Sequence, residues 1–285
     1  MTNQPTAKTT PTLTFVPAGG MGNRMKALSA AITLARQCHS RAEIIWFRDG
    51  GLGCRFDQLF LPLDEPDATL REATLTDLLL HDRPRRRNLY VPLCAQRLLY
   101  EGRMDEQACT QGMRTHFDFV EWATGKRAWM SSHVYFMADE PPTGTYDRFR
   151  LIPQLQQRVD RTVAEAGDDV VGVHIRRTDN ERSIAESPTE AFIARMRQES
   201  GGTRFFLATD NEEEQQRIAA AFPHRVITSP RPADRRTLQG MEDAAVEMFT
   251  LSRTRLILGS AYSTFSSAAA GIGHIPLEIV KKTVI

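Results

Sequence analysis

The sequence predicts an α/β protein with two doubly wound parallel sheets. Short apolar segments end in glycine-rich or polar loops and are followed by stretches of helical periodicity, and this alternation recurs in both halves of the chain. The length of 285 residues corresponds to two modest domains at about 150 residues each. Hydrophobic residues make up 41% and charged residues 25% of the chain, which are ordinary globular values and exclude wholesale disorder.

The N-terminal part predicts a βαβ unit. Residues 1–11 are polar and rich in Thr and Pro, and we expect a disordered lead-in. An apolar strand over 13–16 runs into a glycine-rich loop over 17–24, and apolar residues on one face predict a helix over 25–38. A second apolar strand follows over 44–47. This order indicates a parallel sheet that begins near the N-terminus.

Residues 50–150 have a less regular pattern. It predicts helical residues over 75–80 and a short strand over 88–93. Between them lies the basic run Arg83–Arg87, which Pro84 interrupts. Such a run is either a solvated loop or a patch that contacts an anionic substrate or, weakly, a membrane surface.

The second half repeats strand and helix clearly. A buried type of strand over 169–175 precedes a polar loop over 176–186. Ser187 is the predicted N-cap of the next helix, with Pro188 at its first position and Glu190 closing a capping box. The remaining predicted elements are a strand over 204–208, a helix from Asp210 to about 221, a strand over 225–228, a helix near 242–252, a strand over 256–258, an Ala-rich helix and a strand over 277–280. We therefore expect an N-terminal domain over 12–150 and a C-terminal domain over 151–285.

Composition excludes several classes of protein. Lys and Arg total 36 against 35 for Asp and Glu, so the strong basic excess of a nucleic-acid coat is absent. No apolar run reaches a membrane span, and the N-terminus lacks a signal-peptide core, so we expect a cytoplasmic protein. The four cysteines form no C-x-x-C pair, the histidines show no ligand spacing and there is no D-x-D triplet, so we expect no metal. P-loop and G-x-S-x-G motifs are absent too.

Candidate binding residues follow four predicted strands. In open α/β sheets, ligands bind beyond the carboxyl ends of the strands. The first segment, Gly19–Arg24, is similar to a dinucleotide fingerprint, but Met25 stands where the third glycine belongs. Asp49 occupies the place of a ribose-binding acid. The loop therefore has three interpretations: a weakly indicated NAD-binding loop, a tight turn without a ligand, or a segment that brings Asn23 close to a ligand bound mainly by the C-terminal half of the chain.

The second segment ends the strand over 169–175. Alternate strand residues share a face, so His174 and Arg176 point together and Arg177 points away. Arginines at the end of a buried strand are costly unless an anion meets them, and a guanidinium suits a diphosphate. The alternative is internal pairing, for instance of Arg177 with Asp179.

The third and fourth segments have structural alternatives as well. Asp210 with Glu213 forms a capping box, which can be the only role of Asp210, although Thr209 and Asn211 could face the cleft. The hydroxyls of Ser260–Ser267 at a helix start form an anion site or a plain N-cap.

Taken together, the four segments resemble a known family. Residues 174–179 are similar to the H-x-R-R-x-D motif of the α1,2-/α1,6-/protein O-fucosyltransferase superfamily, the nodulation-type and related GDP-fucose glycosyltransferases. Residues 19–23 resemble its G-G-x-G-N loop, and residues 206–211 and 263–267 its second and third C-terminal motifs. The motifs occur in the family's order across most of the chain.

The resemblance implies a GT-B-like fold of two Rossmann-like domains facing a central cleft. It implies inverting, metal-independent transfer of fucose from GDP-fucose to a glycan or glycolipid acceptor, with the acceptor on the N-terminal domain and no cofactor or nucleic acid. It also implies donor-binding roles for Gly20, Gly22, Asn23, His174, Arg176, Arg177, Asp210, Glu247, Thr264, Phe265, Ser266 and Ser267.

Two roles stay open within the resemblance. The catalytic base is Asp179, Glu181 or Glu186, and the spacing does not choose between them. Glu247 occupies the place where the α1,6 branch carries the acid that binds guanine; the alternatives are a solvated helix residue, or a partner of Arg253 or Arg255. Two rival functions also remain: a non-catalytic nucleotide-sugar-binding protein, and a transferase that uses another sugar nucleotide.

Overall fold

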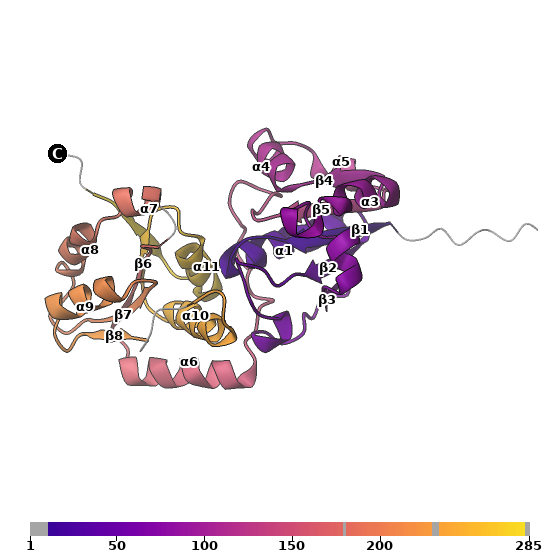
Figure 1. Ribbon diagram of the computed structural model, residues 1–285. Coiled ribbons are helices and arrows are strands. Elements are labelled where there is room, and N and C mark those ends of the chain that lie inside the picture. The colour runs from indigo at the N-terminus through magenta and orange to yellow at the C-terminus, as the bar shows by residue number, and fades with distance from the viewer. Residues whose placement is uncertain (1–10, 179–180, 230–233, 283–285) are drawn as a thin grey trace, which may run out of the picture. The chain divides into compact units, whose positions relative to one another are not determined.

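The computed structural model describes residues 11–178, 181–229 and 234–282, and the chain divides into two compact units (Figure 1). Unit 1 comprises residues up to 19, 26–47 and 63–141. Unit 2 comprises residues 20–25, 48–62 and 142–285. Each unit holds one five-stranded sheet in which every pairing is parallel. The predicted α/β class with two Rossmann-like sheets is thereby confirmed.

The sheet of unit 1 has the strand order β3-β2-β1-β5-β4. Its centre is apolar: Phe15 pairs in register with Ile44 of β2 and with Met130 of β5, and all three side chains are buried. The elements are β1 (Thr12–Pro17), α1 (Met21–Gln37), β2 (Arg41–Trp46), β3 (Ala68–Glu72), α2 (Leu75–Leu80), η2 (Arg86–Asn88), α3 (Val91–Leu99), β4 (Gly102–Met104), α4 (Glu106–Arg114), α5 (Phe119–Ala123) and β5 (Ala128–Ser132).

Two predictions in the N-terminal half are wrong. The expected strand over 88–93 is the short helix η2 followed by α3, because Pro92 favours the first turn of a helix and Leu89 and Tyr90 adopt left-handed backbone conformations that end any extended segment. The first helix begins at Met21 rather than at Met25, so half of the expected loop lies in its first turn. The turn before it depends on Gly19, whose φ is +81°.

The sheet of unit 2 has the strand order β10-β9-β6-β7-β8. The strand order therefore reverses between β6 and β9, and ligands of doubly wound sheets bind at such a point. The elements are η1 (Phe56–Gln58), α6 (Pro153–Ala166), β6 (Val170–Ile175), α7 (Glu181–Glu186), α8 (Thr189–Met196), β7 (Arg204–Thr209), α9 (Glu212–Ala221), β8 (Val226–Thr228), α10 (Leu238–Leu251), β9 (Ile257–Ser260), α11 (Thr264–Gly273) and β10 (Leu277–Val280).

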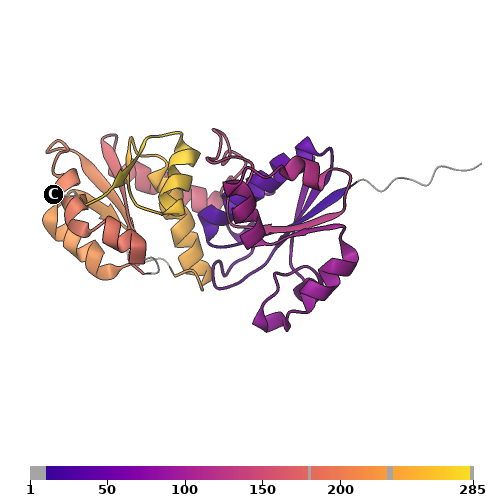
Figure 2. The ribbon, with the colours of Figure 1, turned by 90° about the horizontal axis from the view of Figure 1, so that it is seen from above.

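The alternation of side chains along β6 separates a core from a binding face. Val171, Val173 and Ile175 belong to an apolar cluster that also contains residues of α8 and α9. The opposite face meets α10, since a Cβ on Gly172 would lie 2.8 Å from Leu251. His174 shares that face with Gly172. Helices therefore cover both faces of this sheet (Figure 2).

Three local predictions in the C-terminal half are corrected. Residues 181–186 of the expected loop form α7. Ser187 does not cap α8, whose N-cap is Pro188; the Ser187 hydroxyl instead donates to the carbonyl of Val280 and accepts from the amide of Ala261. α9 is capped by Asn211, which accepts a hydrogen bond from the amide of Glu214 at 2.9 Å, and not by Asp210.

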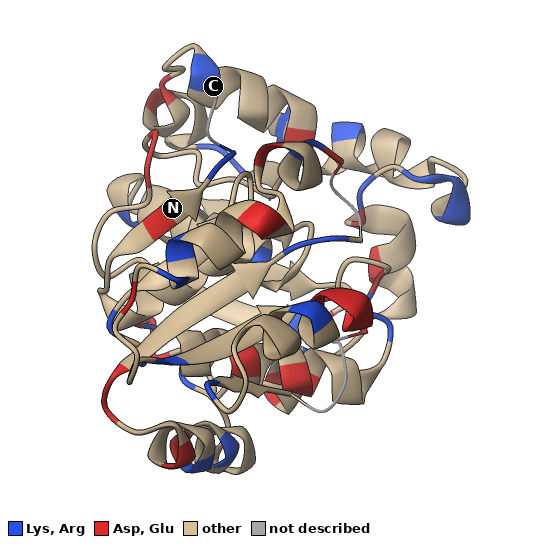
Figure 3. Cartoon of the chain, turned by 90° about the vertical axis from the view of Figure 1, so that its left-hand side faces the viewer, with Lys and Arg blue, Asp and Glu red and all other residues tan. Residues whose placement is uncertain are grey.

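Charges of both signs are interspersed over the chain, as the net charge of +1 predicts (Figure 3). The four cysteines are free, and only Cys94 is exposed. Among the described helices, none combines the length and apolar character that a membrane span requires.

Candidate functional site

Unit 2 contains a cavity at the carboxyl ends of β6, β7 and β9. Three of the four predicted segments line it from these strand ends, and the fourth enters through the first turn of α1. The predicted residues on its wall are Gly20, Gly22, Asn23, His174, Arg176, Asp210, Glu247, Thr264 and Phe265.

The glycine-rich segment brings two helix starts close together. A Cβ on Gly22 would lie 2.8 Å from the carbonyl oxygen of Thr264, so only glycine permits this approach. Asn23 lies beside it on the cavity wall. The start of α1 and the start of α11 thus lie side by side at the cavity, and backbone amides at helix starts attract anions.

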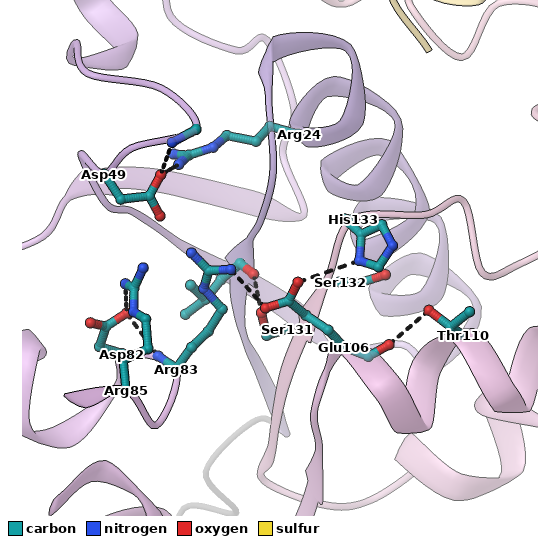
Figure 4. A network of polar contacts seen from close by, with 12 residues as sticks. Arg24, Asp49, Asp82, Arg83, Arg85, Glu106, Thr110, Ser131, Ser132 and His133 are labelled. Atoms are coloured by element: carbon teal, nitrogen blue, oxygen red, sulfur yellow. Dashed lines mark hydrogen bonds and ion pairs between the residues drawn. The ribbon is translucent and has the colours of Figure 1, made fainter. Parts of the chain in front are cut away.

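Asp49 does not serve as a ribose-binding acid. One of its carboxylate oxygens accepts hydrogen bonds from Arg24 at 2.7 Å and from the amide of Gly51 at 3.0 Å (Figure 4). Arg24 is fully buried, so Asp49 is its counter-ion. The pair is structural, which removes the one acid that supported a dinucleotide reading of this loop.

His174 forms a neutral aromatic wall. Its ring stacks on Phe265 with centroids 4.8 Å apart, and its Nδ1 lies 3.2 Å from the hydroxyl of Ser263. Burial lowers the pKa of His174 to about 4, so the ring is uncharged at neutral pH. An uncharged stacked pair suits a flat or apolar part of a ligand better than a phosphate.

The two arginines after β6 diverge as predicted. Arg176 lines the cavity, and its amide donates to the hydroxyl of Ser260 at 3.1 Å. Arg177 points away: it donates to Thr189 at 2.9 Å and lies 3.4 Å from a carboxylate oxygen of Glu214. Arg177 is therefore paired internally, as the alternative interpretation expected, with Glu214 as its partner. Asp179, the partner named in that interpretation, lies outside the described residues.

Asp210 holds the turn that follows Arg176. Its carboxylate accepts hydrogen bonds from the amide of Arg177 at 2.7 Å, from the amide of Thr178 at 3.3 Å and from the hydroxyl of Thr178 at 2.6 Å. The prediction that Asp210 caps α9 is thus wrong. Its carboxylate instead links the end of β7 to the loop after β6. The carboxylate fixes the backbone from which Arg176 extends.

Glu247 is a buried acid on the cavity wall. Only 4% of the residue is exposed, which excludes a solvated helix position. Burial raises the pKa of Glu247 to about 8, and the nearby charges of Asp243 and Asp210 add to this effect. The alternative partner Arg255 binds Asp169 and Glu199 instead.

Thr209 is a binding candidate that the sequence suggested without assigning it a role. It lines the cavity at the end of β7, is 6% exposed, and its hydroxyl has no hydrogen-bond partner among the described residues. A buried hydroxyl without a partner is costly, so a ligand group is the natural partner. Met241 and Ala244 of α10 also line the cavity; apolar helix residues carry no motif that could have identified them.

The Ser-rich segment contributes Ser263, Thr264 and Phe265 to the cavity. Thr264 and Phe265 line it at the start of α11. The hydroxyls of Ser266 and Ser267 donate to the carbonyl of Ser263, at 3.3 and 3.1 Å. Ser266 and Ser267 thus stabilise the first turn of α11 and do not line the cavity wall.

The three candidate bases lie apart from the cavity wall or outside the described residues. Glu181 is exposed at the start of α7. Glu186 accepts a hydrogen bond from the hydroxyl of Tyr262 at 2.8 Å. Asp179 lies outside the described residues. Over residues 11–178, 181–229 and 234–282, no three His, Cys, Asp or Glu side chains are grouped so that they could hold a metal ion.

The basic run of unit 1 is largely paired within the unit. Arg83 donates to Glu106 at 2.7 Å, and Arg85 and Arg87 both contact the buried carboxylate of Asp82 (Figure 4 shows the first two of these pairs). Arg83, Arg85 and Arg87 are therefore neutralised by acids of unit 1. Arg86 alone of the run shows no such pairing in the described part of the chain.

Comparison with known proteins identifies the fold. No protein-family model and no curated protein sequence matches the chain. Among solved structures, NodZ α-1,6-fucosyltransferase soaked with GDP-fucose is similar with a TM-score of 0.66 at 15% identity, over 92% of each chain. NodZ from Bradyrhizobium gives a TM-score of 0.66 at 16% identity, over 92% of this chain and 93% of that one. POFUT1 in complex with GDP-fucose gives 0.58 at 11% identity, over 95% and 98%. The chain therefore has the GT-B-like fold of these fucosyltransferase structures.

Proposed function

We propose that the protein is a glycosyltransferase that binds GDP-fucose in the cavity of unit 2 and transfers fucose to a hydroxyl acceptor with inversion. The carrying observation is the composition of one cavity, whose wall combines the guanidinium of Arg176, residues at two helix starts and the buried carboxyl group of Glu247. These groups match the two ends of a guanosine diphosphate. The solved structures of the same fold, named for fucosyltransferases and bound to GDP or GDP-fucose, support the choice.

The diphosphate end of the ligand is assigned to Arg176 and to the amides at the starts of α1 and α11. When the bond between fucose and the β-phosphate breaks, negative charge grows on the phosphate oxygens. A fixed guanidinium and fixed amides stabilise that charge more in the transition state than in the ground state. Asp210 holds the turn at Arg177 and Thr178, so the guanidinium of Arg176 starts from a fixed backbone.

The base end is assigned to Glu247 of α10, because a carboxylate can bind the hydrogen-bonding edge of guanine. An ionised carboxylate accepts two parallel hydrogen bonds from N1–H and the exocyclic amine of guanine, a pair that adenine and uracil do not offer. The buried Glu247 has a side-chain hydrogen bond to Ser229 but no ion-pair partner in the described part of the chain, so the two guanine donors would complete the hydrogen bonding of its carboxylate. A buried bidentate contact of this kind favours guanine over other bases by a few kcal/mol, because the wrong base leaves the carboxyl group without hydrogen-bond partners.

The transfer itself is a single displacement. The acceptor oxygen forms a bond to C1 of fucose, the bond from C1 to the β-phosphate oxygen breaks, GDP leaves, and a carboxylate takes the acceptor proton. Asp179, Glu181 and Glu186 are the candidates for that carboxylate. The hydrogen bond from Tyr262 occupies one oxygen of Glu186, which favours Asp179 and Glu181.

Calorimetry with GDP, ADP and UDP tests the nucleotide assignment. GDP is expected to bind at least about tenfold more tightly than ADP or UDP, at 1.4 kcal/mol per decade. Glu247→Gln is expected to erase most of that preference, because its amide presents one acceptor and one donor to the guanine. Equal affinity of the wild-type protein for all three nucleotides would end the GDP-fucose proposal.

Hydrolysis and transfer assays with GDP-fucose test the reaction. Activity is expected to survive EDTA, because Arg176 and the helix starts supply the positive charge that a metal ion supplies elsewhere. Loss of activity in EDTA, with recovery on addition of magnesium or manganese, contradicts metal-independent transfer. GDP binding without turnover toward any acceptor identifies the rival, a non-catalytic binding protein, and turnover with another sugar nucleotide identifies a different transferase.

A further inference from the structure

Helix α3 of unit 1 presents an apolar face to solvent. Leu89 and Tyr90, which precede it, and Val91 and Leu98 within it are 80%, 58%, 42% and 85% exposed. Val91 and Leu98 lie seven residues apart and therefore on one side of the helix. The opposite side buries polar Gln96, whose amide donates to the carbonyl of Asp82 at 2.8 Å. This is the reverse of an ordinary surface helix, which turns its apolar side inward.

The backbone holds this apolar face in place. Leu89 and Tyr90 have φ values of +51° and +57°, a region in which bulky side chains are rare. Hydrogen bonds fix the turn: the amide of Leu89 donates to the carbonyl of Arg86 at 3.1 Å, and the amide of Tyr90 donates to the carbonyl of Arg85 at 3.3 Å. The chain thus adopts a strained conformation that exposes a leucine and a tyrosine together, and strain of this kind is typical of functional sites.

The surroundings of the apolar face are basic. From Arg83 to Tyr100 the sequence contains five arginines and no acidic residue. The acids that neutralise three of them, Asp82 and Glu106, lie outside this segment, and Asp82 is fully buried. Arg86 and Arg97 are exposed, and neither forms an ion pair within the described residues. Apolar side chains and uncompensated arginines therefore occur along the same short segment.

We propose that the α3 face, defined as Leu89, Tyr90, Val91 and Leu98 with Arg86 and Arg97, docks unit 1 onto an anionic lipid bilayer. Apolar side chains enter the boundary between head groups and acyl chains, tyrosine prefers that boundary, and arginines bind lipid phosphates. With nine residues α3 lies along the surface and does not cross it.

Charge complementarity distinguishes this occupant from a second protein. Arg86 and Arg97 need an anionic partner, and an anionic lipid surface supplies phosphates wherever the two arginines meet it, whereas a protein partner would need an acidic side chain placed opposite each of them. The adjoining helix α2, which packs against α3, exposes two further leucines, Leu75 at 86% and Leu79 at 47%. This docking function goes beyond the proposed transferase activity and does not depend on it.

The native Cys94 reports on docking directly. It lies on α3 between Val91 and Leu98 and is the exposed cysteine of the four, so a thiol-reactive, polarity-sensitive fluorophore such as acrylodan labels it selectively. The labelled protein is mixed with vesicles of phosphatidylcholine alone or with 30% phosphatidylglycerol added. We expect a blue shift of emission and co-sedimentation with the anionic vesicles only, both weakened at high salt.

Paired variants separate the two contributions. Leu89→Ser with Tyr90→Ser is expected to weaken vesicle binding by at least about tenfold, and Arg86→Glu with Arg97→Glu by a similar factor, because each pair removes one of the two signals that stable docking needs. Matched controls in unit 2 are Leu238→Ser and Arg253→Glu, both at exposed positions. They are expected to bind vesicles as the wild-type protein does.

Several results overturn the proposal. One is no binding to anionic vesicles, and another is binding that the α3 variants leave unchanged. A blue shift that appears without vesicles and grows with protein concentration shows instead that α3 contacts a second copy of the chain. A fluorophore on Ala219→Cys in a Cys94→Ser background is the control for adsorption; an equal blue shift there also overturns docking through α3. Nucleotide is absent throughout, so failure here leaves the donor-binding proposal untouched.

Discussion

Each unit buries a carboxyl group, but the two units treat its charge in opposite ways. In unit 1 the carboxylate of Asp82 is fully buried and is contacted by Arg85, Arg87 and Asn88. In unit 2 the equally buried Glu247 has no guanidinium partner in the described part of the chain, and burial raises its pKa to about 8. A buried charge that is fully paired needs no ligand, whereas a buried acid without a counter-ion at a cavity wall indicates a binding site.

Asp82→Asn gives the largest expected effect, on the unit in which charge is paired. The amide keeps the shape but leaves Arg85 and Arg87 without their anion, so we expect a loss of about 3 kcal/mol in the free energy of unfolding. Denaturant unfolding measures it. The matched control is Asp67→Asn, whose carboxylate pairs with the exposed Arg36 and should contribute less than about 1 kcal/mol. Similar losses in both variants would show that burial of the pair is not what matters.

Arg176→Lys probes the guanidinium that lines the cavity of unit 2. Lysine keeps the charge but loses the planar fork, so turnover of the donor is expected to fall by about 100-fold, comparable to removing one oxyanion-type donor. Stability should stay unchanged, in contrast to Asp82→Asn. Full activity with an intact circular-dichroism spectrum would refute a diphosphate role for Arg176.

Sequence reasoning succeeded where residue type and strand position agree. His174 and Arg176 on one face, and Arg177 on the other, follow from the alternation of a strand alone, and the strand ends of β6, β7 and β9 meet at one edge because the sheet is parallel. It failed where a tertiary contact decided the outcome. Asp210 and Ser187 carry good capping patterns, but each has a partner distant in sequence.

The arginine run shows a limit of the same kind. Three of its members contact Asp82 or Glu106, and no spacing rule links Glu106 to Arg83 across 23 residues. Met241 and Ala244, the apolar residues of α10 that line the cavity, could not be predicted either. Their residue types do not distinguish them from core residues until the fold is known.

The protonation of Glu247 gives a smaller, pH-dependent effect. In the free protein its raised pKa keeps it protonated at pH 7, whereas guanine requires the carboxylate, so GDP binding is expected to release a proton and to strengthen with pH up to about 8. The gain is at most about tenfold per pH unit. Calorimetry in buffers of different ionisation enthalpy counts the protons. Proton release that persists in Glu247→Gln would assign it to another group.

The same shift affects stability with a definite sign. Because the folded-state pKa of Glu247 lies above its value in the unfolded chain, the protonated group favours folding fully below about pH 4.3, and this contribution is lost as pH rises through the folded-state value of about 8. Glu247→Gln removes the titration, so the wild-type protein should lose stability relative to the variant over that window. Parallel stability curves for the two proteins would show that the pKa is not raised.

Thr209→Val gives the smallest expected effects, and those on stability and on GDP affinity have opposite signs. The substitution keeps the side-chain shape and removes a buried hydroxyl that has no partner among the described residues. The free protein is therefore expected to gain about 1 kcal/mol of stability. If the hydroxyl bonds the nucleotide, GDP affinity should fall by about fivefold, as for the loss of one neutral hydrogen bond.

Thr250→Val is the matched control, because its hydroxyl is also buried and without a partner in the described chain, but Thr250 does not line the cavity. It should raise stability by a similar amount and leave GDP affinity unchanged. Thermal unfolding and calorimetry on both variants decide the matter. If both variants are stabilised and bind GDP equally well, the unsatisfied hydroxyl of Thr209 is a packing defect of β7. If only Thr209→Val weakens binding, the hydroxyl is kept unpaired in the free protein for the ligand.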